Sequence, residues 1–539
     1  GRRNRLGRAL GRRALTDAAR IGDDGAEKDA PEADMATLAR GGRLNIFGFV
    51  LRLAGMGPFL FIAGRIYGPE ALGRFAYAVL TVEFAAQLAA LGLRRGLAQL
   101  LADAKRPQAC VIADALLIAL IGSIIGMAIL IVFPKAMYPT TTVLGMDRLL
   151  AVTVLAISCT DIALAGLAYH HDVGATVRAR SIVQPWTITI VAFGWSYWSI
   201  RDGLIVAYIC SMIAALVAAL IPLVRCYGVP HGWRPDIPGA WRTARRNVPL
   251  AAADAVEWAS RRIDLAVLGA FMPAVYVGVY YVAQQVATLP AKLKSSFEPV
   301  LGPAITRRLA ANDREAVAKQ VRQVTYWIIA AQIGIAMALA IPGRAVMALV
   351  GSGFTGGTAT LAFLLAAEVI AATAVVSEAA LIFVARTRNM VISIIMLALE
   401  AALAVGLILV MRDQGLPPSF QATGPAIALC VALGFASIAK ARLLARELGA
   451  PVSGWRWDLA WATAAGAVVG AGVRYLLPQS LQLVIGVPAI LAVFGAVLWT
   501  KGFTPDDRAL FRLGKEDVKD LREAEAAAEA SDQVEDDVV

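Results

Sequence analysis

A cluster of charged side chains within an apolar stretch is the part of this sequence best suited to bind charged groups. Five ionisable residues, Asp254, Glu257, Arg261, Arg262 and Asp264, fall within eleven positions. Carboxylates can bind a proton or a cation, and arginine binds phosphate or carboxylate through two parallel hydrogen bonds. Facing lipid, these groups would cost on the order of 15 kcal/mol, at about 3 kcal/mol each. We therefore expect them to face protein or water.

The spacing of these residues predicts one charged strip on a helix over residues 247–270. At about 100° per residue, Asp254, Glu257, Arg261 and Asp264 fall within an arc of roughly 80°. Glu257 and Arg261 stand in the favourable i,i+4 order, whereas Arg262 points elsewhere, toward another helix or a ligand. Two interpretations remain open, and they are compatible: an internally neutralised ladder of ion pairs, or one wall of a polar cavity.

Other charges in apolar stretches stand alone. Arg52 precedes the flexible segment Gly55–Pro58, and we expect it to line the same cavity; a side chain that reaches the lipid–water interface or pairs with another helix is the open alternative. Each isolated acid is expected to hydrogen-bond a neighbouring helix, which is the usual fate of a buried carboxyl group. These acids are Glu83, Asp161, Glu368, Glu378 and Glu400.

Several kinds of chemistry are not indicated. The three histidines and five cysteines have no metal-ligand or disulfide spacing, so we expect no metal and no disulfide framework. No nucleotide-binding loop and no hydrolase motif is found. We therefore predict a protein that is not an enzyme and has no cofactor, with coupling to H⁺ or Na⁺ left open.

The composition indicates a membrane protein. Hydrophobic residues make up 58% of the 539 positions and charged residues 17%, against about 25% charged in an average soluble domain. The apolar residues form runs of about 20, long enough to cross a bilayer as helices. The formal net charge is +11, but the basic residues lie in short connections between these runs, which argues against nucleic-acid binding.

Fourteen apolar runs predict an all-α polytopic membrane protein with about 14 transmembrane helices. Lysine and arginine concentrate in the even-numbered connections, from Arg94 and Arg95 through Arg178 and Arg180 to Lys440, which predicts that both termini are cytoplasmic. The runs are 44–66, 72–93, 109–133, 149–169, 181–200, 203–224, 247–270, 275–297, 323–348, 359–385, 390–411, 422–444, 457–476 and 480–500.

A weak internal repeat suggests two pseudo-symmetric lobes of six helices, followed by two C-terminal helices. A shift of 205 residues matches Gly64 with Gly269 and Gly73 with Gly278, in corresponding hairpins. The predicted organisation is a cytoplasmic tail (1–43), an N-lobe (44–226), a cytoplasmic linker (227–246), a C-lobe (247–447), helices 13 and 14 (448–500) and an acidic cytoplasmic tail (501–539).

Short motifs carry a resemblance to a known family. The stretch Ile66–Phe75 reads Ile-Tyr-Gly-Pro-Glu-Ala-Leu-Gly-Arg-Phe, and the following run ends in Leu91-Gly92-Leu93. Both resemble the first hairpin of the polysaccharide (O-antigen and exopolysaccharide) flippases, in the multidrug/oligosaccharidyl-lipid/polysaccharide exporter superfamily. Counterparts in the second half are Asp264, Gly269, Gly278 to Tyr280, Ala283, Pro290 and Pro299 to Ile305.

The resemblance implies a function. Such proteins move polyprenyl-diphosphate-linked oligosaccharides from the cytoplasmic to the outer face of the bacterial inner membrane by alternating access. On that basis Arg52, Arg261 and Arg262 are the expected substrate-binding residues, and Asp254, Glu257 and Asp264 the cavity or coupling residues. The expected partners are the lipid-linked oligosaccharide, membrane lipids and, as an open prospect, polysaccharide-assembly proteins, with the transporter itself monomeric.

Other functions remain open at this stage. A drug or cation antiporter of the same superfamily is disfavoured because the first run carries Arg52 and no acid. A peptidoglycan-precursor flippase would share the fold and the arginines. A membrane glycan polymerase or ligase usually needs a large external loop, and none longer than about 15 residues is expected here.

Overall fold

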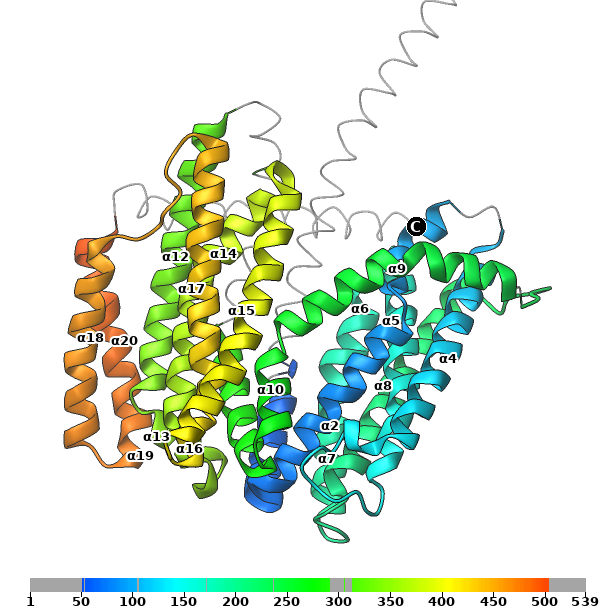
Figure 1. Cartoon of the computed structure of the whole chain (residues 1–539), viewed down its shortest axis with the longest axis horizontal. Coiled ribbons are helices and arrows are strands. Elements are labelled where there is room, and N and C mark those ends of the chain that lie inside the picture. Colours follow the sequence, from blue (N-terminus) through cyan, green and yellow to red (C-terminus); the bar gives the residue numbers. More distant parts are fainter. Residues whose placement is uncertain are drawn as a thin grey trace, which may run out of the picture. The chain divides into compact units, whose positions relative to one another are not determined.

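The computed structural model describes residues 51–52, 54–103, 106–170, 172–235, 237–290, 305 and 313–503. Throughout these residues the regular secondary structure is helical, with no β-strand (Figure 1). The expected all-α membrane architecture is therefore confirmed. The predicted N-terminal tail lies outside the described residues, as does all of the predicted C-terminal tail after Phe503.

The chain divides into two compact units, residues 1–261 and 262–539. The boundary falls between Arg261 and Arg262, later than the linker at 227–246 that the sequence suggested. Much of that linker is helical, because α9 begins at Ile237. The internal repeat stays a prediction.

Unit 1 is built of long apolar helices that pack side by side, and α9 runs across their upper ends in Figure 1. Buried leucine, isoleucine and alanine side chains of α3, α4, α5, α8 and α9 form its core. The principal helices are η1 (Ala63–Tyr67), α2 (Gly68–Ala89), α3 (Leu93–Ala102), α4 (Gln108–Val132), α5 (Thr153–Tyr169), η4 (Val177–Val183), α7 (Gln184–Trp195), α8 (Gly203–Tyr227) and α9 (Ile237–Ser260); short turns are η2 (Pro134–Ala136), η3 (Asp147–Val152) and α6 (Val173–Thr176).

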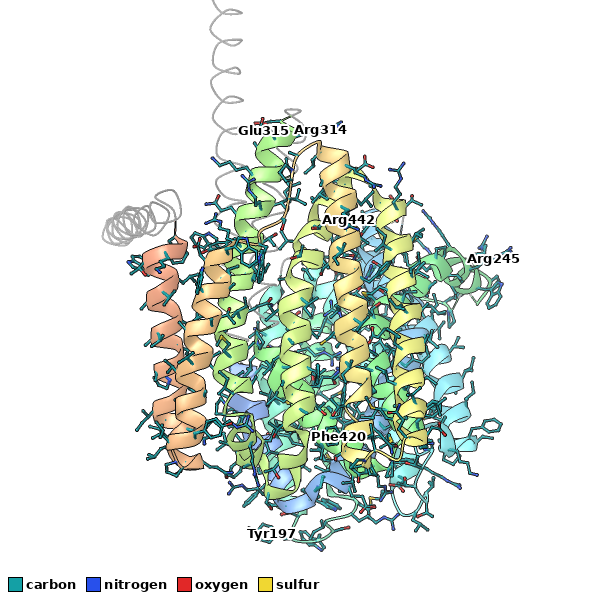
Figure 2. The ribbon with its side chains drawn as sticks, turned by 60° about the vertical axis from the view of Figure 1, so that its left-hand side comes forward. Tyr197, Arg245, Arg314, Glu315, Phe420 and Arg442 are labelled. Atoms are coloured by element: carbon teal, nitrogen blue, oxygen red, sulfur yellow. The ribbon has the colours of Figure 1, made fainter. Side chains whose placement is uncertain are left out.

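Unit 2 has a second core, in which α12, α14 and α17 pack together and α18 and α20 pack against α12. Figure 2 shows Arg314, Glu315 and Arg442 toward one end of these helices and Phe420 toward the other. The helices are α10 (Ile263–Phe271), a helix over 274–290, α12 (Arg314–Ala340), α13 (Gly343–Val350), α14 (Thr358–Val384), α15 (Arg386–Asp413), α16 (Pro418–Gln421), α17 (Gly424–Leu448), α18 (Trp457–Leu476), α19 (Gln479–Leu481), α20 (Val487–Val497) and the turns η5 (Ser352–Gly357), η6 (Gln482–Gly486) and η7 (Leu498–Gly502).

The described helices include ten that are long and apolar enough to cross a membrane. The first two predicted spans merge with α3 into one helical stretch, Ala54–Ala102. Three other predicted spans fall on helices that do not qualify. The span 181–200 lies on helical residues 173–195, which carry Arg178, Arg180 and Gln184, and the span 247–270 is interrupted between α9 and α10. The span 275–297 lies on a helix that is described only from residue 274 to residue 290. The protein is therefore a multi-pass membrane protein.

Several boundaries differ from the sequence prediction because polar residues extend the helices beyond the apolar runs. Helix α12 begins at Arg314 rather than at 323 and ends at Ala340, where α13 follows after a turn. Helix α17 continues to Leu448, beyond the predicted end at 444; Lys440, which was counted as a loop charge although the run 422–444 covers it, lies within the helix. Hydropathy locates the lipid-facing part of a helix but not its water-facing ends.

Aromatic side chains lie near both ends of α18. Trp457 and Trp461, at its start, are 77% and 67% exposed, and Tyr475, at its end, is 85% exposed. Tryptophan and tyrosine concentrate at the two water–lipid interfaces of membrane proteins. The exposed face of α18 is therefore a lipid-facing surface with an aromatic residue at each interface.

A buried ion-pair cluster connects two turns of unit 1 to the start of α2. Asp147 is fully buried, and its Oδ2 lies 2.8 Å from Arg74 Nη2 and 3.7 Å from Arg201 Nη2. The backbone N–H of Leu144 also donates to this oxygen, at 2.9 Å. The carboxylate thus holds the stretch Ile66–Phe75 and the connection before α5 together.

Replacing Asp147 by asparagine is expected to lower the stability of the protein by about 3 kcal/mol, because it leaves the partly buried Arg74 without its counter-ion. Thermal unfolding in detergent, followed by circular dichroism, measures the change. Asp103→Asn is the matched control, since Asp103 is exposed. Equal melting temperatures for the two variants would contradict a structural role for Asp147.

Candidate functional site

The charged residues of α9 form ion pairs with two arginines of α3. Asp254 is 3% exposed, and its Oδ1 lies 2.6 Å from Arg95 Nε and 3.6 Å from Arg94 Nη2. Arg95 also forms a close ion pair with Glu257, and Arg261 Nη2 lies 3.2 Å from the other oxygen of Glu257. We call these five residues the α3–α9 network. It contains three cations and two carboxylates, so it carries a surplus positive charge.

A glycine in the left-handed region positions α3 against α9. Gly92 has φ of +68° and directly precedes α3. A Cβ at this position would lie 2.6 Å from the backbone N of Ala251 and 2.8 Å from Leu250 Cβ. Only glycine allows both the turn and the close approach of α9. The Leu91-Gly92-Leu93 motif therefore brings Arg94 and Arg95 to Asp254.

Gly92→Ala is expected to destabilise the protein by several kcal/mol, because it combines a clash with backbone atoms and a strained φ of about 1–2 kcal/mol. Two control variants separate these causes. Gly68→Ala has the strain alone, since φ there is +78° and nothing lies near its Cβ, whereas Gly57→Ala has neither. Melting temperatures should fall in the order Gly57, Gly68, Gly92. Equal values for the Gly68 and Gly92 variants would contradict the close approach of α9.

The predicted strip does not continue as a single helix. Helix α9 ends at Ser260 and α10 begins at Ile263, with Arg261 and Arg262 in the turn between them. The 80° arc over Asp254 to Asp264 is therefore wrong, since it assumed an unbroken helix. The structure brings Asp254, Glu257 and Arg261 together in unit 1 and places Asp264 in unit 2.

Asp264 belongs to a second, more deeply buried cluster. It is 2% exposed and accepts hydrogen bonds from the hydroxyl of Tyr280 at 2.7 Å, the backbone N–H of Leu265 at 2.7 Å and the amide of Gln284 at 3.1 Å. Arg262 interacts with it electrostatically.

A second carboxyl group lies near Asp264. Glu400 of α15 is 1% exposed and interacts electrostatically with Asp264. Its Oε2 is buried without a hydrogen-bond partner among the described residues. We call Asp264, Glu400, Tyr280 and Gln284 the buried acid cluster. Two carboxyl groups in low dielectric favour binding of a proton or a small cation.

The remaining predicted residues lie as follows. Arg52 is described and exposed, in the first helical residues of unit 1. Two isolated acids pair with a neighbouring helix, as expected: Asp161 with Arg180 of η4, and Glu378 Oε2 with Lys440 Nζ at 2.9 Å.

Sequence reasoning missed the partners of both clusters. Arg94 and Arg95 were counted as connection charges, although they directly follow the Leu91–Leu93 motif. Glu400 was taken as an isolated acid. Among the described residues, no group of three histidine, cysteine, aspartate or glutamate side chains could hold a metal ion.

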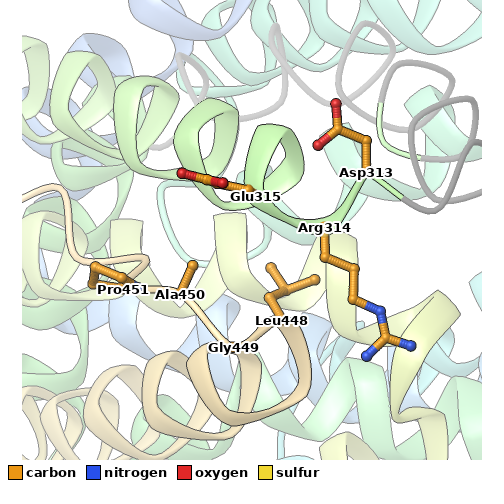
Figure 3. Close-up of a pocket in the computed structure, with 7 residues that line it drawn as sticks. All are labelled: Asp313, Arg314, Glu315, Leu448, Gly449, Ala450 and Pro451. Atoms are coloured by element: carbon orange, nitrogen blue, oxygen red, sulfur yellow. The ribbon is translucent and has the colours of Figure 1, made fainter.

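A surface cleft of about 760 Å³ lies elsewhere in unit 2, between the start of α12 and the end of α17 (Figure 3). Arg314 in its wall donates to the backbone oxygen of Glu447, at 3.1 Å, and Asp313 accepts the N–H of Ala316 as the helix cap. The cleft contains no residue of either cluster. We therefore place the candidate site at the two clusters and not here. It is lined by Asp313, Arg314, Glu315, Leu448, Gly449, Ala450 and Pro451.

The fold is that of the MOP-superfamily transporters. It is similar to the lipid II flippase MurJ in an inward closed conformation, with 10% identity, a TM-score of 0.64 and coverage of 85% of this chain and 98% of that one. It is also similar to an inward-facing multidrug resistance MATE family transporter, with 14% identity, a TM-score of 0.57 and coverage of 74% of this chain and 98% of that one. A MOP superfamily transporter from Pyrococcus furiosus is similar with 13% identity, a TM-score of 0.52 and coverage of 77% of this chain and 95% of that one.

A family model described as polysaccharide biosynthesis protein matches residues 62–356, more than half of the chain. The chain therefore belongs to this polysaccharide biosynthesis family, and the resemblance suggested by the hairpin motifs is confirmed. No curated protein sequence matched the chain.

Proposed function

We propose that this protein moves a polyprenyl-diphosphate-linked oligosaccharide from the cytoplasmic to the outer face of the bacterial inner membrane. Membership in the polysaccharide biosynthesis family and the MOP fold support transport for glycan assembly. In this proposal the protein is a monomeric transporter and not an enzyme, with both termini in the cytoplasm. Its partners are the lipid-linked glycan, the surrounding lipids and polysaccharide-assembly proteins.

The observation that carries the proposal is the cationic surplus of the α3–α9 network. Side chains of Arg94, Arg95 and Arg261 are 41%, 43% and 75% exposed, so a ligand can reach them. A diphosphate offers oxygens in the geometry that guanidinium groups bind best. Its oxygens can replace those of Glu257 on Arg95 without leaving the arginine unpaired.

Arg52 and Arg262 remain further candidates for phosphate binding beside Arg261, as the sequence suggested. The carboxylates Asp254 and Glu257 then hold the arginines in place between transport cycles. This role differs from the coupling role that the sequence suggested for them, because both acids are already paired with arginine.

Coupling to a proton or Na⁺ falls instead to the buried acid cluster. Asp264 is fully hydrogen-bonded, whereas Glu400 has a buried oxygen with no hydrogen-bond partner among the described residues. Binding of a cation there, and its release, change the charge of unit 2 within the membrane. That change gives an ion gradient a means of driving alternating access.

The test is disruption of the gene in its native bacterium, with surface polysaccharide and lipid-linked glycan measured together. We expect loss of the surface polymer and accumulation of full-length lipid-linked repeat units at the cytoplasmic face. Truncated or unlinked repeats would indicate an enzyme of assembly instead. Accumulation of the peptidoglycan precursor would indicate a different flippase, and unchanged glycans would overturn the proposal.

A further inference from the structure

Helix α9 has a buried face and an exposed face with different compositions. Its buried side chains include Ala240, Ala244 and Asn247, and the two alanines belong to the core of unit 1. The opposite face exposes Trp241 (71%) and Val248 (52%). The unit 1 core thus holds the helix by one side only.

Three arginines lie on the exposed face. Arg242, Arg245 and Arg246 are exposed and form no ion pair or hydrogen bond with the described residues. At about 100° per residue they share an arc of roughly 160° with Trp241 and Val248, and no acid falls within that arc. Figure 2 shows Arg245 projecting away from the ribbon.

This face has the composition of a helix that lies in a membrane interface. An apolar edge with tryptophan enters the boundary between headgroups and acyl chains, and arginines beside it reach the lipid phosphates. The position of α9 across the ends of the unit 1 helices places it where such an interface must lie (Figure 1). Its basic charge is complementary to anionic lipid and repels other cations.

We propose that the exposed face of α9 is a binding site for anionic phospholipid headgroups of the surrounding bilayer. The arginines bind the phosphates, and Trp241 and Val248 contact the acyl chains. Asp254 and Glu257, which pair with Arg95 of α3, lie farther along α9, so lipid binding also fixes the helix that carries these two carboxylates. The site needs no glycan, so its test is independent of the proposed function; only the choice of leaflet depends on the proposed orientation.

Hydrogen exchange of the full-length protein in nanodiscs tests the proposal. We compare phosphatidylcholine alone with a mixture containing phosphatidylglycerol and follow residues 237–250. Anionic lipid should slow exchange by roughly fivefold for each arginine engaged, and high salt should remove the effect. The triple variant R242Q/R245Q/R246Q should lose the difference.

A matched control removes the same charge elsewhere. Arg386, Arg442 and Arg446 are exposed residues of unit 2, and R386Q/R442Q/R446Q should keep the full lipid effect. As a second measurement, the difference in fluorescence between the unmodified protein and Trp241→Phe gives the emission of Trp241. Brominated phosphatidylglycerol should quench this emission. The proposal would be overturned if the exchange rate did not depend on headgroup charge, or if the two triple variants behaved alike. Protection by a soluble polyanion but not by lipid would also overturn it.

Discussion

Replacing Arg95 by glutamine is expected to stop the proposed glycan export and to lower the amount of folded protein. Arg95 is the closest cation to Asp254, and after its removal the buried carboxylate keeps only Arg94, at 3.6 Å. Breaking one side of a buried ion pair costs about 3–5 kcal/mol. Surface polysaccharide and protein abundance are measured in the same cells.

The double variant R95Q/D254N separates structure from ligand binding. It removes the unpaired carboxylate together with the arginine, so abundance should recover. Export should stay about 10- to 100-fold lower, because the ligand loses one hydrogen bond to a charged group, which contributes about 1.5–3 kcal/mol. Recovery of export with abundance would show that the network is only a structural ladder. Arg225→Gln, at an exposed arginine at the end of α8, is the matched control and should behave as the unmodified protein.

Neutralising the buried acid cluster should abolish the proposed coupling of transport to an ion gradient. Asp264→Asn and Glu400→Gln keep the shape of each side chain while removing a group that can bind a cation. In proteoliposomes we expect glycan movement that no longer responds to an imposed pH or Na⁺ gradient. Because tyrosine and glutamine still hydrogen-bond position 264, the variants should fold.

A measurement without glycan supports this test. If Na⁺ is the coupling ion, it should raise the melting temperature of the unmodified protein and leave that of Asp264→Asn unchanged. If a proton is used, Na⁺ should affect neither, and the gradient response should follow pH alone. Glu315→Gln, at an exposed acid of α12, is the matched control. Normal gradient responses in both cluster variants would refute coupling through these acids.

The sequence was informative wherever the signal is local. Runs of apolar residues located the helices, since membrane thickness sets their length, and the hairpin motifs identified the family. The i,i+4 order of Glu257 and Arg261 correctly predicted their contact, because both lie within one regular stretch. The break after Ser260 could not be read, because neither Gly nor Pro marks it.

Tertiary pairing left no such signal. Arg94 and Arg95 look like ordinary positive-inside residues, and only the close approach at Gly92 places them against Asp254. Likewise, Glu400 and Asp264 are remote in sequence and meet through the packing of α15 on α10. Lys440 is a similar case: its side chain is only 4% exposed and pairs with Glu378 of α14, a contact that its count as a loop charge did not predict.

The aromatic residues at the two ends of α18 also indicate the membrane that suits this protein. Trp457 and Tyr475 are separated by about 27 Å along the helix, at 1.5 Å per residue, against about 30 Å of hydrocarbon in a typical bilayer. A thicker bilayer would draw these side chains out of their interfaces, and a thinner one would tilt the helix. The acyl-chain length of the bilayer should therefore change the tilt of α18 and the position of its aromatic side chains, whatever the headgroup charge.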